Sequence, residues 1–268
     1  MVNNKSMSVI DAVDDLASKF IDRRTIKIGG FWDFVRDYWS KGYENPELFN
    51  TWHVGTICED VERAIQEGKN YVAVLPRYHF KSTVLGHAFS VWRFLSSNRD
   101  TDILYLSYSD GMSQYHLSEI NKHVRRIPEL MEMMEDRSPQ ADYSFRYMVN
   151  NRQANILHGG LFSFKRGLHV NGGVDDILRD PENPLNLGQL NKIEDHFMTE
   201  SMFIPNRGAP IIVIGTPMAP EDLLTKLQND ERFISRVLPV FNPTPDRYIL
   251  APEIFTEEEL KEHQRARP

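Results

Sequence analysis

Short apolar runs alternate with longer amphipathic stretches along much of this chain. The runs predict buried strands at 71–75, 102–107, 211–214 and 233–240. The stretch 155–164 predicts a hairpin or a pair of short strands around Gly159-Gly160. Apolar residues at helical spacing predict helices at 50–68, 84–95, 112–126 and 187–203. Because strands and helices alternate, we expect a mostly parallel sheet flanked by crossover helices.

Two further helices are predicted near the ends of the chain. At 9–20, apolar residues recur every three or four positions. Near the other end, Thr256 precedes an acidic stretch with Glu259 three residues later, which is the spacing of a capping box. Between 31 and 39, aromatic residues cluster, and we expect most of them to pack onto the main core.

The segment YVAVLPRYHFKST, at 71–83, has the order of a phosphate-binding loop: strand, tight turn, Lys-Ser-Thr, helix. The loop itself comprises Pro76, Arg77, Tyr78, His79, Phe80, Lys81, Ser82 and Thr83. In such a loop, backbone N–H groups at the helix N-terminus point at phosphate, where the helix dipole favours negative charge. Lys81 would contact the β- and γ-phosphates, and the hydroxyl of Ser82 would bind Mg²⁺.

Both glycines of the standard G-x-x-x-x-G-K-[ST] pattern are absent, since Leu75 and Phe80 occupy their positions. Taken alone, the segment is equally consistent with a surface turn that carries an ordinary lysine. Other parts of the chain must therefore decide between the two interpretations.

A phosphate-loop enzyme needs an acidic element at the end of a neighbouring strand. Asp175-Asp176 fits this need, with Asp175 as the metal ligand and Asp176 as the base that activates water. Asp180 and Glu182 lie nearby and compete for either role, and a solvated Asp-Asp turn is the simpler explanation.

Three more residues are candidates around the same site. Arg166, nine residues before Asp175, could act as an arginine finger on a neighbouring subunit, and Arg77 could act within its own subunit. Thr216 follows the apolar run at 211–214 and is placed to sense the γ-phosphate and couple it to another domain. Taken alone, each arginine is more often an ordinary surface residue, and the segment with Thr216 is more simply a strand followed by a turn that proline stabilises.

Composition narrows the protein class. The chain has 268 residues, 41% of them hydrophobic and 26% charged, as expected of a globular domain. No apolar run reaches the ~20 residues of a membrane-spanning helix, and the start lacks the pattern of a secretory signal. A single cysteine, Cys58, excludes an internal disulfide. The net charge of −7 argues against a broad nucleic-acid footprint but allows local contacts.

In combination, these segments resemble the large terminase subunit of tailed bacteriophages, the motor that packages DNA. The resemblance covers most of residues 50–268. It rests on the loop and the helix before it, on FKRGLHVNGGVDDI, on IIVIGTPMAPEDLL, and on LAPEIFTEEELKEHQRAR, in which Ala251 replaces the family's Trp.

The resemblance implies an α/β, RecA-like P-loop NTPase fold of the ASCE class, with a small helical N-terminal leader. It carries over Lys81, Ser82 and Thr83 as phosphate and Mg²⁺ residues, Asp175 and Asp176 as the Walker B pair, and Thr216 as the coupling residue. Arg77 and Arg166 become the arginine-finger candidates. The family's base is most often Glu, so Asp176 departs from the pattern by one methylene.

The expected organisation is a helical leader at 1–45, an ATPase core at 46–250, and the start of a linker at 251–268. The family's nuclease domain would follow this linker, and we expect no nuclease activity from this chain. The expected ligands are ATP and Mg²⁺.

The resemblance further implies that the chain would translocate double-stranded DNA into a procapsid, in the cytoplasm of a host cell. Its partners would be the portal protein, the small terminase subunit and further copies of itself in a ring, although an isolated chain would be a monomer. Two alternatives stay open: another P-loop NTPase of helicase or repair type, or a scaffold module that binds nucleotide without hydrolysing it.

Overall fold

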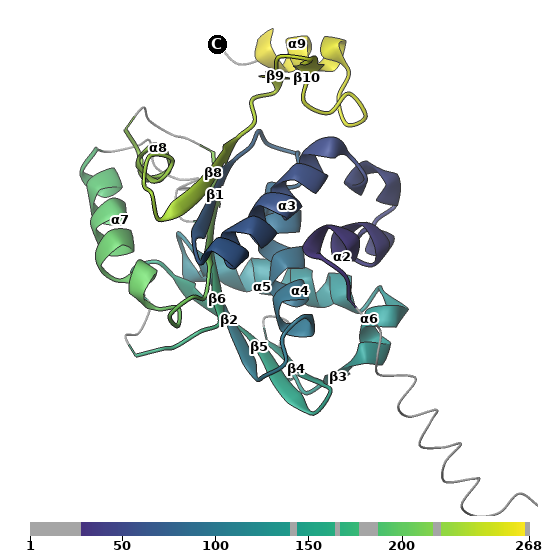
Figure 1. Ribbon diagram of the computed structural model, residues 1–268, viewed down its shortest axis with the longest axis vertical. Coiled ribbons are helices and arrows are strands. Elements are labelled where there is room, and N and C mark those ends of the chain that lie inside the picture. Colours follow the sequence, from purple (N-terminus) through teal and green to yellow (C-terminus); the bar gives the residue numbers. More distant parts are fainter. Residues whose placement is uncertain (1–27, 140–143, 164–166, 177–186, 217–220, 266–268) are drawn as a thin grey trace, which may run out of the picture.

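The computed structural model describes residues 28–139, 144–163, 167–176, 187–216 and 221–265. In these residues, eight strands form one sheet in the order β3-β4-β5-β2-β6-β7-β1-β8, and β9 and β10 form a separate hairpin (Figure 1). The strands are β1 (Asn70–Val74), β2 (Thr101–Ser107), β3 (Met134–Asp136), β4 (Phe145–Val149), β5 (Arg152–Gly160), β6 (Gly172–Asp176), β7 (Ile211–Gly215), β8 (Phe233–Val237), β9 (Phe241–Thr244) and β10 (Arg247–Ile249).

The six strands from β5 to β8 in this order pair in parallel, whereas β4 and β3 add antiparallel pairs at one edge. Parallel strands need crossover connections, which the helices supply. The helical segments are α2 (Phe31–Asp37), η1 (Trp39–Gly42), η2 (Pro46–Phe49), α3 (Trp52–Glu67), η3 (Ser82–Ala88), α4 (Phe89–Leu95), α5 (Asp110–Val124), α6 (Pro128–Met133), α7 (Leu187–Thr199), η4 (Ser201–Phe203), α8 (Leu223–Leu227) and α9 (Glu257–Arg265).

The sheet separates two hydrophobic cores. On one face, buried side chains of α2 to α6 pack against alternate strand residues. On the other face, α7 and α8 pack against the strand residues whose side chains point to the opposite side of the sheet (Figure 1). The predicted fold class, a mostly parallel central sheet flanked by helices, is therefore confirmed.

Local sequence signals located several element ends correctly. The helix predicted at 50–68 is α3, and Gly68 ends it with a φ of 66°, which glycine adopts without a steric cost. At α9, the backbone N–H of Thr256 donates to Glu259 Oε2 at 2.8 Å, and the backbone N–H of Glu259 donates to Thr256 Oγ1 at 3.3 Å. The predicted capping box is thus present.

The predicted hairpin around Gly159-Gly160 is wrong. Residues 152–160 form one strand, β5, which pairs in parallel with β2 along its C-terminal part. The hairpin lies earlier, between β4 and β5, where Asn150 and Asn151 have φ values of 51° and 61°. Asparagine tolerates these positive values better than most residues, so it suits the tight turn between two antiparallel strands. The last strand of the sheet also ends earlier than predicted, at Val237.

The N-terminal aromatic cluster packs onto the core, as expected. Phe31, Phe34 and Trp39 are completely buried. The predicted helix at 9–20 lies outside the described residues, and the division at 45 and 250 remains a prediction. No helix in the described part of the chain is long and apolar enough to cross a membrane.

One ion cluster fixes α3 to the edge strand β8. The side chain of Asp60 is 5% exposed, and Arg236 donates to both of its oxygens, at 2.6 and 3.0 Å. Arg63 donates to the same carboxylate at 2.9 Å. Because α3 leads directly into β1, this cluster also fixes the strand from which the phosphate-loop candidate extends.

Candidate functional site

The strands that carry the predicted site residues are neighbours in the sheet. The order β6-β7-β1 places β7 between the other two, and all three are parallel, so their carboxyl ends lie at one edge. Val74 pairs with Gly215, and Asp175 pairs with Val213. Adjacent strands are ~4.8 Å apart, which puts β1 and β6 roughly 10 Å apart. The loop after β1, Thr216 after β7 and Asp176 in β6 therefore lie at the same end of the sheet, which is where ligands usually bind in such sheets.

The loop after β1 has an unusual backbone. Tyr78 and Phe80 have φ values of 67° and 60°, whereas Lys81 has right-handed helical values of −53° and −54°. A left-handed residue followed by a right-handed one turns successive backbone N–H groups toward the same side, which forms a concave anion site. Such a site directly before a helix is the backbone geometry that phosphate binding requires.

Phe80 explains how the loop manages without glycine. A left-handed conformation costs a non-glycine residue about 1–2 kcal/mol. The half-buried ring of Phe80 stacks on Phe49, with centroids 4.4 Å apart, and Phe49 in turn contacts Tyr43 at 4.7 Å. Aromatic pairs contribute about 0.5–1.5 kcal/mol beyond their buried area. The ring therefore packs with the core, while the backbone keeps the conformation that glycine would have.

This explanation predicts an unusual order of stability for two substitutions. Phe80→Ala and Phe80→Gly both lose the contact with Phe49, but only alanine retains the steric cost of a positive φ. We expect Phe80→Gly to be more stable than Phe80→Ala by about 1 kcal/mol in chemical denaturation. Phe49 belongs to the same aromatic stack but has no positive φ. At this position we therefore expect Phe49→Ala to be more stable than Phe49→Gly. Equal or reversed stabilities at position 80 would contradict the explanation.

The helix after the loop begins in a widened form. Lys81 is its first helical residue, and Ser82–Ala88 (η3) is wound as a π-helix, a form often found at functional sites. η3 packs against β6 and β7. A Cβ atom on Gly86 would lie 2.7 Å from the hydroxyl oxygen of Tyr105 in β2, so glycine permits this close approach. Lys81, Ser82 and Thr83 are half-buried at the loop end of this helix.

A pair of histidines holds the far end of η3. Nε2 of His87 and Nδ1 of His116 in α5 are 2.9 Å apart, and the His116 ring stacks on Tyr105 with centroids at 4.9 Å. Burial lowers the pKa of His87 well below its ordinary value. His87 is therefore neutral at pH 7, and its hydrogen bond to His116 fixes the end of η3 to α5.

Two histidines, His79 and His53, pack on the buried side of the loop. The side chain of His79 is 1% exposed, and its Nδ1 lies 2.8 Å from the carbonyl oxygen of Arg77. His53, in the first turn of α3, contacts it edge-on at 5.8 Å. Burial lowers the pKa of His53 to about 3 and also lowers that of His79. Both rings therefore support the loop as neutral groups. Of the polar residues in the loop, Arg77 is exposed, and Lys81, Ser82 and Thr83 are half-buried.

Asp176 lies on the same face of the sheet as η3 and α4. A Cβ atom on Gly172 would contact Phe89 and Arg93 of α4, and Val174 belongs to the core on that face. Side chains alternate along a strand, so Asp176 shares this face. Asp175 is described only through its backbone, which pairs with Leu106 and Val213. The expected division of roles, Asp175 for metal and Asp176 for catalysis, remains a prediction.

The remaining candidates differ in how far the structure describes them. Thr216 is half-buried directly after β7. A Cβ atom on Gly215 would lie 2.7 Å from Leu224, so this glycine allows α8 to pack closely against the end of β7. Arg166, Asp180 and Glu182 lie outside the described residues. Sequence reasoning missed the contacts of Phe49 and His53 with the loop, because nothing local marks a contact between distant segments.

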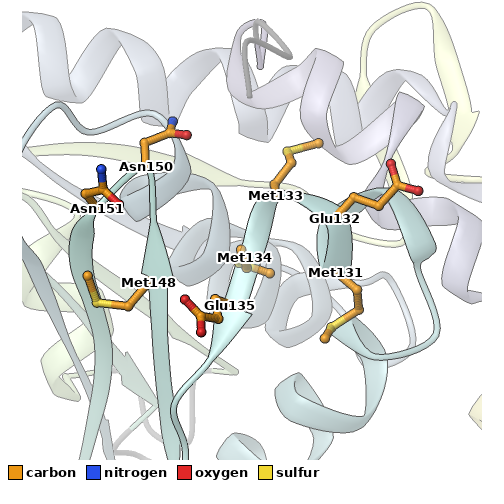
Figure 2. A pocket seen from close by; sticks show the side chains of 8 residues that line it. All are labelled: Met131, Glu132, Met133, Met134, Glu135, Met148, Asn150 and Asn151. Carbon is orange, nitrogen blue, oxygen red and sulfur yellow. The ribbon is translucent and has the colours of Figure 1, made fainter. Parts of the chain in front are cut away.

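A pocket elsewhere in the molecule is not part of this site. It has a volume of about 350 Å³ and lies at the β3 edge of the sheet, away from β1 (Figure 2). Four methionines, two glutamates and two asparagines line it: Met131, Glu132, Met133, Met134, Glu135, Met148, Asn150 and Asn151. The methionine cluster at 131–134 thus spans the end of α6 and the start of β3.

No family model and no curated protein matches this chain. Two structures of the large terminase from a thermophilic bacteriophage, in different crystal forms, resemble it, with TM-scores of 0.53 and 0.52 at 7% and 9% sequence identity. Each match covers 76% of this chain and 46% of that protein. The HK97 bacteriophage large terminase has a TM-score of 0.48 at 15% identity, covering 78% of this chain and 46% of that protein.

This chain therefore spans less than half the length of the large terminases to which it is similar. The resemblance noted in the sequence is confirmed at the level of the fold: the described part of the chain folds like the RecA-like part of a bacteriophage large terminase.

Proposed function

We propose that this chain is the ATP-hydrolysing motor domain of a viral terminase, which moves double-stranded DNA into a procapsid. The observation that carries the proposal is the loop at 76–83. Its backbone has left-handed conformations at Tyr78 and Phe80 and then enters a helix at Lys81, at the sheet edge shared by Asp176 and Thr216. A cation, hydroxyls and a carboxylate around concave N–H groups suit a nucleoside triphosphate.

Each residue has a role in this proposal. The backbone N–H groups from Arg77 to Thr83 would bind phosphate oxygens, and Lys81 would contact the β- and γ-phosphates. The acidic pair Asp175-Asp176 would supply a metal ligand and a group that orients or deprotonates the attacking water. Thr216 would sense the γ-phosphate from the end of β7. Arg77 in the same subunit, or Arg166 from a neighbouring one, would neutralise charge in the transition state.

The residues present fit Mg²⁺. Ser82 offers a hydroxyl at the start of η3, and Asp176 offers a carboxylate on the face against which η3 packs. Mg²⁺ prefers oxygen ligands and is usually held by one or two carboxylates together with substrate phosphates. When bound, it would neutralise phosphate charge during hydrolysis. Since Asp176 shares the face of η3, we propose that Asp176 contributes to holding the metal, whichever carboxylate acts on water.

The larger assembly is part of the proposal. The partners would be double-stranded DNA, a portal protein, a small terminase subunit and further copies of this chain in a ring, in the cytoplasm of an infected host. With a net charge of −7, the chain would contact DNA through local patches rather than a broad basic surface. Hydrolysis by an isolated monomer would be slow, because an arginine from a neighbouring subunit would be missing.

The test is ATP hydrolysis by Asp176→Asn. This change keeps the size of the side chain but removes the negative charge, so we expect kcat to fall by about 100-fold or more. Because hydrolysis by the isolated chain would be slow, the rate is measured under single-turnover conditions, with enzyme in excess over ATP. Asp246→Asn, which changes an exposed carboxylate in the β9–β10 turn, is the matched control and should retain wild-type activity. Hydrolysis by Asp176→Asn within threefold of the control would contradict the assignment of Asp176.

A further inference from the structure

The segment that follows the sheet contacts the phosphate-loop candidate directly. The ring of Phe255 lies 5.7 Å from the His79 ring, tilted by 40°, and 6.2 Å from the Tyr78 ring, edge-on at 66°. Phe255 directly precedes Thr256, where the capping box of α9 begins. Figure 1 shows β9, β10 and α9 together beyond the end of the sheet at which β8 finishes. One aromatic residue thus joins the loop to the start of α9.

A second attachment fixes the same segment to the start of α3. The Trp52 Nε1–H donates to the carbonyl oxygen of Leu250 at 2.7 Å, and the Arg247 guanidinium lies 4.7 Å above the Trp52 ring. Leu250 and Ala251 are completely buried. The chain between Arg247 and Ala251 is therefore anchored independently of Phe255, so loss of the Phe255 ring would not release the segment.

Tyr78 is the residue in this contact that has an unfavourable backbone conformation. Tyr78 has a φ of 67°, a value that a tyrosine rarely adopts, and it is 71% exposed. Neither Tyr78 nor Phe255 belongs to the two buried cores of the described residues. A strained residue keeps such a conformation only when its surroundings hold it. Phe255 contacts Tyr78 and the neighbouring His79, and so restricts the backbone at the first left-handed position and at the residue after it.

We propose that Phe255 is a positioning residue for the phosphate loop, and that nucleotide binding and the attachment of α9 are coupled through it. This inference rests on the proposed nucleotide-binding function. Coupling between two equilibria is reciprocal. If the contact with Phe255 favours the loop conformation that binds phosphate, then a bound phosphate must stabilise that contact. It would thereby also stabilise the attachment of α9 to the loop.

The first measurement is the affinity of the full chain for Mg²⁺-ADP. Phe255→Ala removes both ring contacts, and we expect the Kd to rise by about tenfold. Phe255→Tyr keeps the ring and should bind within about twofold of wild type. Phe203→Ala is the matched control, since it removes a 70% exposed aromatic residue in η4, outside the phosphate loop, and should not change the Kd. The melting temperature without nucleotide shows whether each variant is folded.

The second measurement is the trypsin cleavage rate after Lys261, an exposed residue of α9. Cleavage requires local opening of the helix, so the cleavage rate reports how firmly α9 is attached to the rest of the chain. Saturating Mg²⁺-ADP should slow cleavage of the wild type by about tenfold, the factor that reciprocity demands. In Phe255→Ala the nucleotide should have no effect on cleavage. A merely structural role for Phe255 would change cleavage equally with and without nucleotide.

The outcomes separate this inference from the function on which it rests. If the wild-type chain does not bind Mg²⁺-ADP, the proposed function fails. If the wild type binds, but Phe255→Ala binds equally well and its cleavage responds equally to nucleotide, the coupling is refuted. Should Phe255→Ala fail to fold, Phe255→Leu replaces it, because leucine fills much of the volume without offering an aromatic ring. An unchanged Kd and cleavage response in Phe255→Leu would then overturn the proposal.

Discussion

Replacing Lys81 by alanine is expected to lower the kcat for ATP hydrolysis by roughly a hundred- to a thousandfold. Lys81 is the first residue of the helix after the loop, next to the left-handed backbone of Phe80. In the proposed site, a cation at this point would face the β- and γ-phosphates, and negative charge would move toward the leaving oxygen during hydrolysis. The interaction is strongest in the transition state, so its loss should reduce kcat more than substrate affinity.

The matched control for this substitution is Lys69→Ala. Lys69 lies just before β1 with its side chain 41% exposed, and the carboxylate of Glu67 is 3.7 Å from its ammonium group. It lies at the opposite end of the strand from the loop, so its loss should leave hydrolysis unchanged. If the single-turnover rate of Lys81→Ala lies within threefold of that of Lys69→Ala, the result would contradict a phosphate-binding role for this loop.

Asp60→Asn is expected to cause the largest loss of stability, about 2–4 kcal/mol in chemical denaturation. The substitution leaves Arg236 and Arg63 facing a buried, neutral amide. Arg236 is one-third exposed, so water can partly replace the lost carboxylate, and the expected loss lies below that of a fully buried pair. The hydrogen bond to Asp60 is also the main reason that the pKa of Arg236 is raised.

Two controls distinguish a buried charge from a general effect of substitution. Glu119→Gln removes one partner of an exposed pair with Lys122 in α5 and should change stability by less than about 0.5 kcal/mol. The double variant Asp60→Leu/Arg236→Met removes the carboxylate and the partly buried guanidinium together. It should be more stable than Asp60→Asn, because the one cation left without a partner, Arg63, has a side chain that is 51% exposed and stays hydrated. If Asp60→Asn costs no more than Glu119→Gln, the cluster does not hold α3 on β8.

The sequence predicted those features that depend on nearby residues. The apolar run that contains β1 is followed at once by a turn and by Lys-Ser-Thr, and the structure places a helix start there. Gly68 and the Thr256–Glu259 box marked helix ends through interactions within a few residues. The alternation of strands and helices was enough to predict a parallel sheet, since only crossover helices can connect parallel neighbours.

Features that depend on distant contacts could not be predicted. Phe80 at a glycine position was unexplained until its ring was found on Phe49, which is 31 residues earlier in the chain. The hydrogen bonds between Asp60 and Arg236 span 176 residues, and no local pattern signals them. The hairpin was misplaced because Gly159-Gly160 suggested a turn more strongly than Asn150-Asn151 did, although both pairs allow one. In the structure, Gly160 instead brings β5 close to the start of α5, since a Cβ atom there would lie 2.8 Å from the backbone nitrogen of Asp110.

The central claim is that the loop at 76–83 binds the phosphates of a nucleotide. An experimental structure with Mg²⁺ and a non-hydrolysable ATP analogue tests it most directly. We expect the β- and γ-phosphates to accept hydrogen bonds from the backbone N–H groups between Phe80 and Thr83, with Lys81 in contact and the Phe80 ring still stacked on Phe49. A nucleotide bound elsewhere on the chain, or a loop that leaves these N–H groups without phosphate at saturating analogue, would contradict the account.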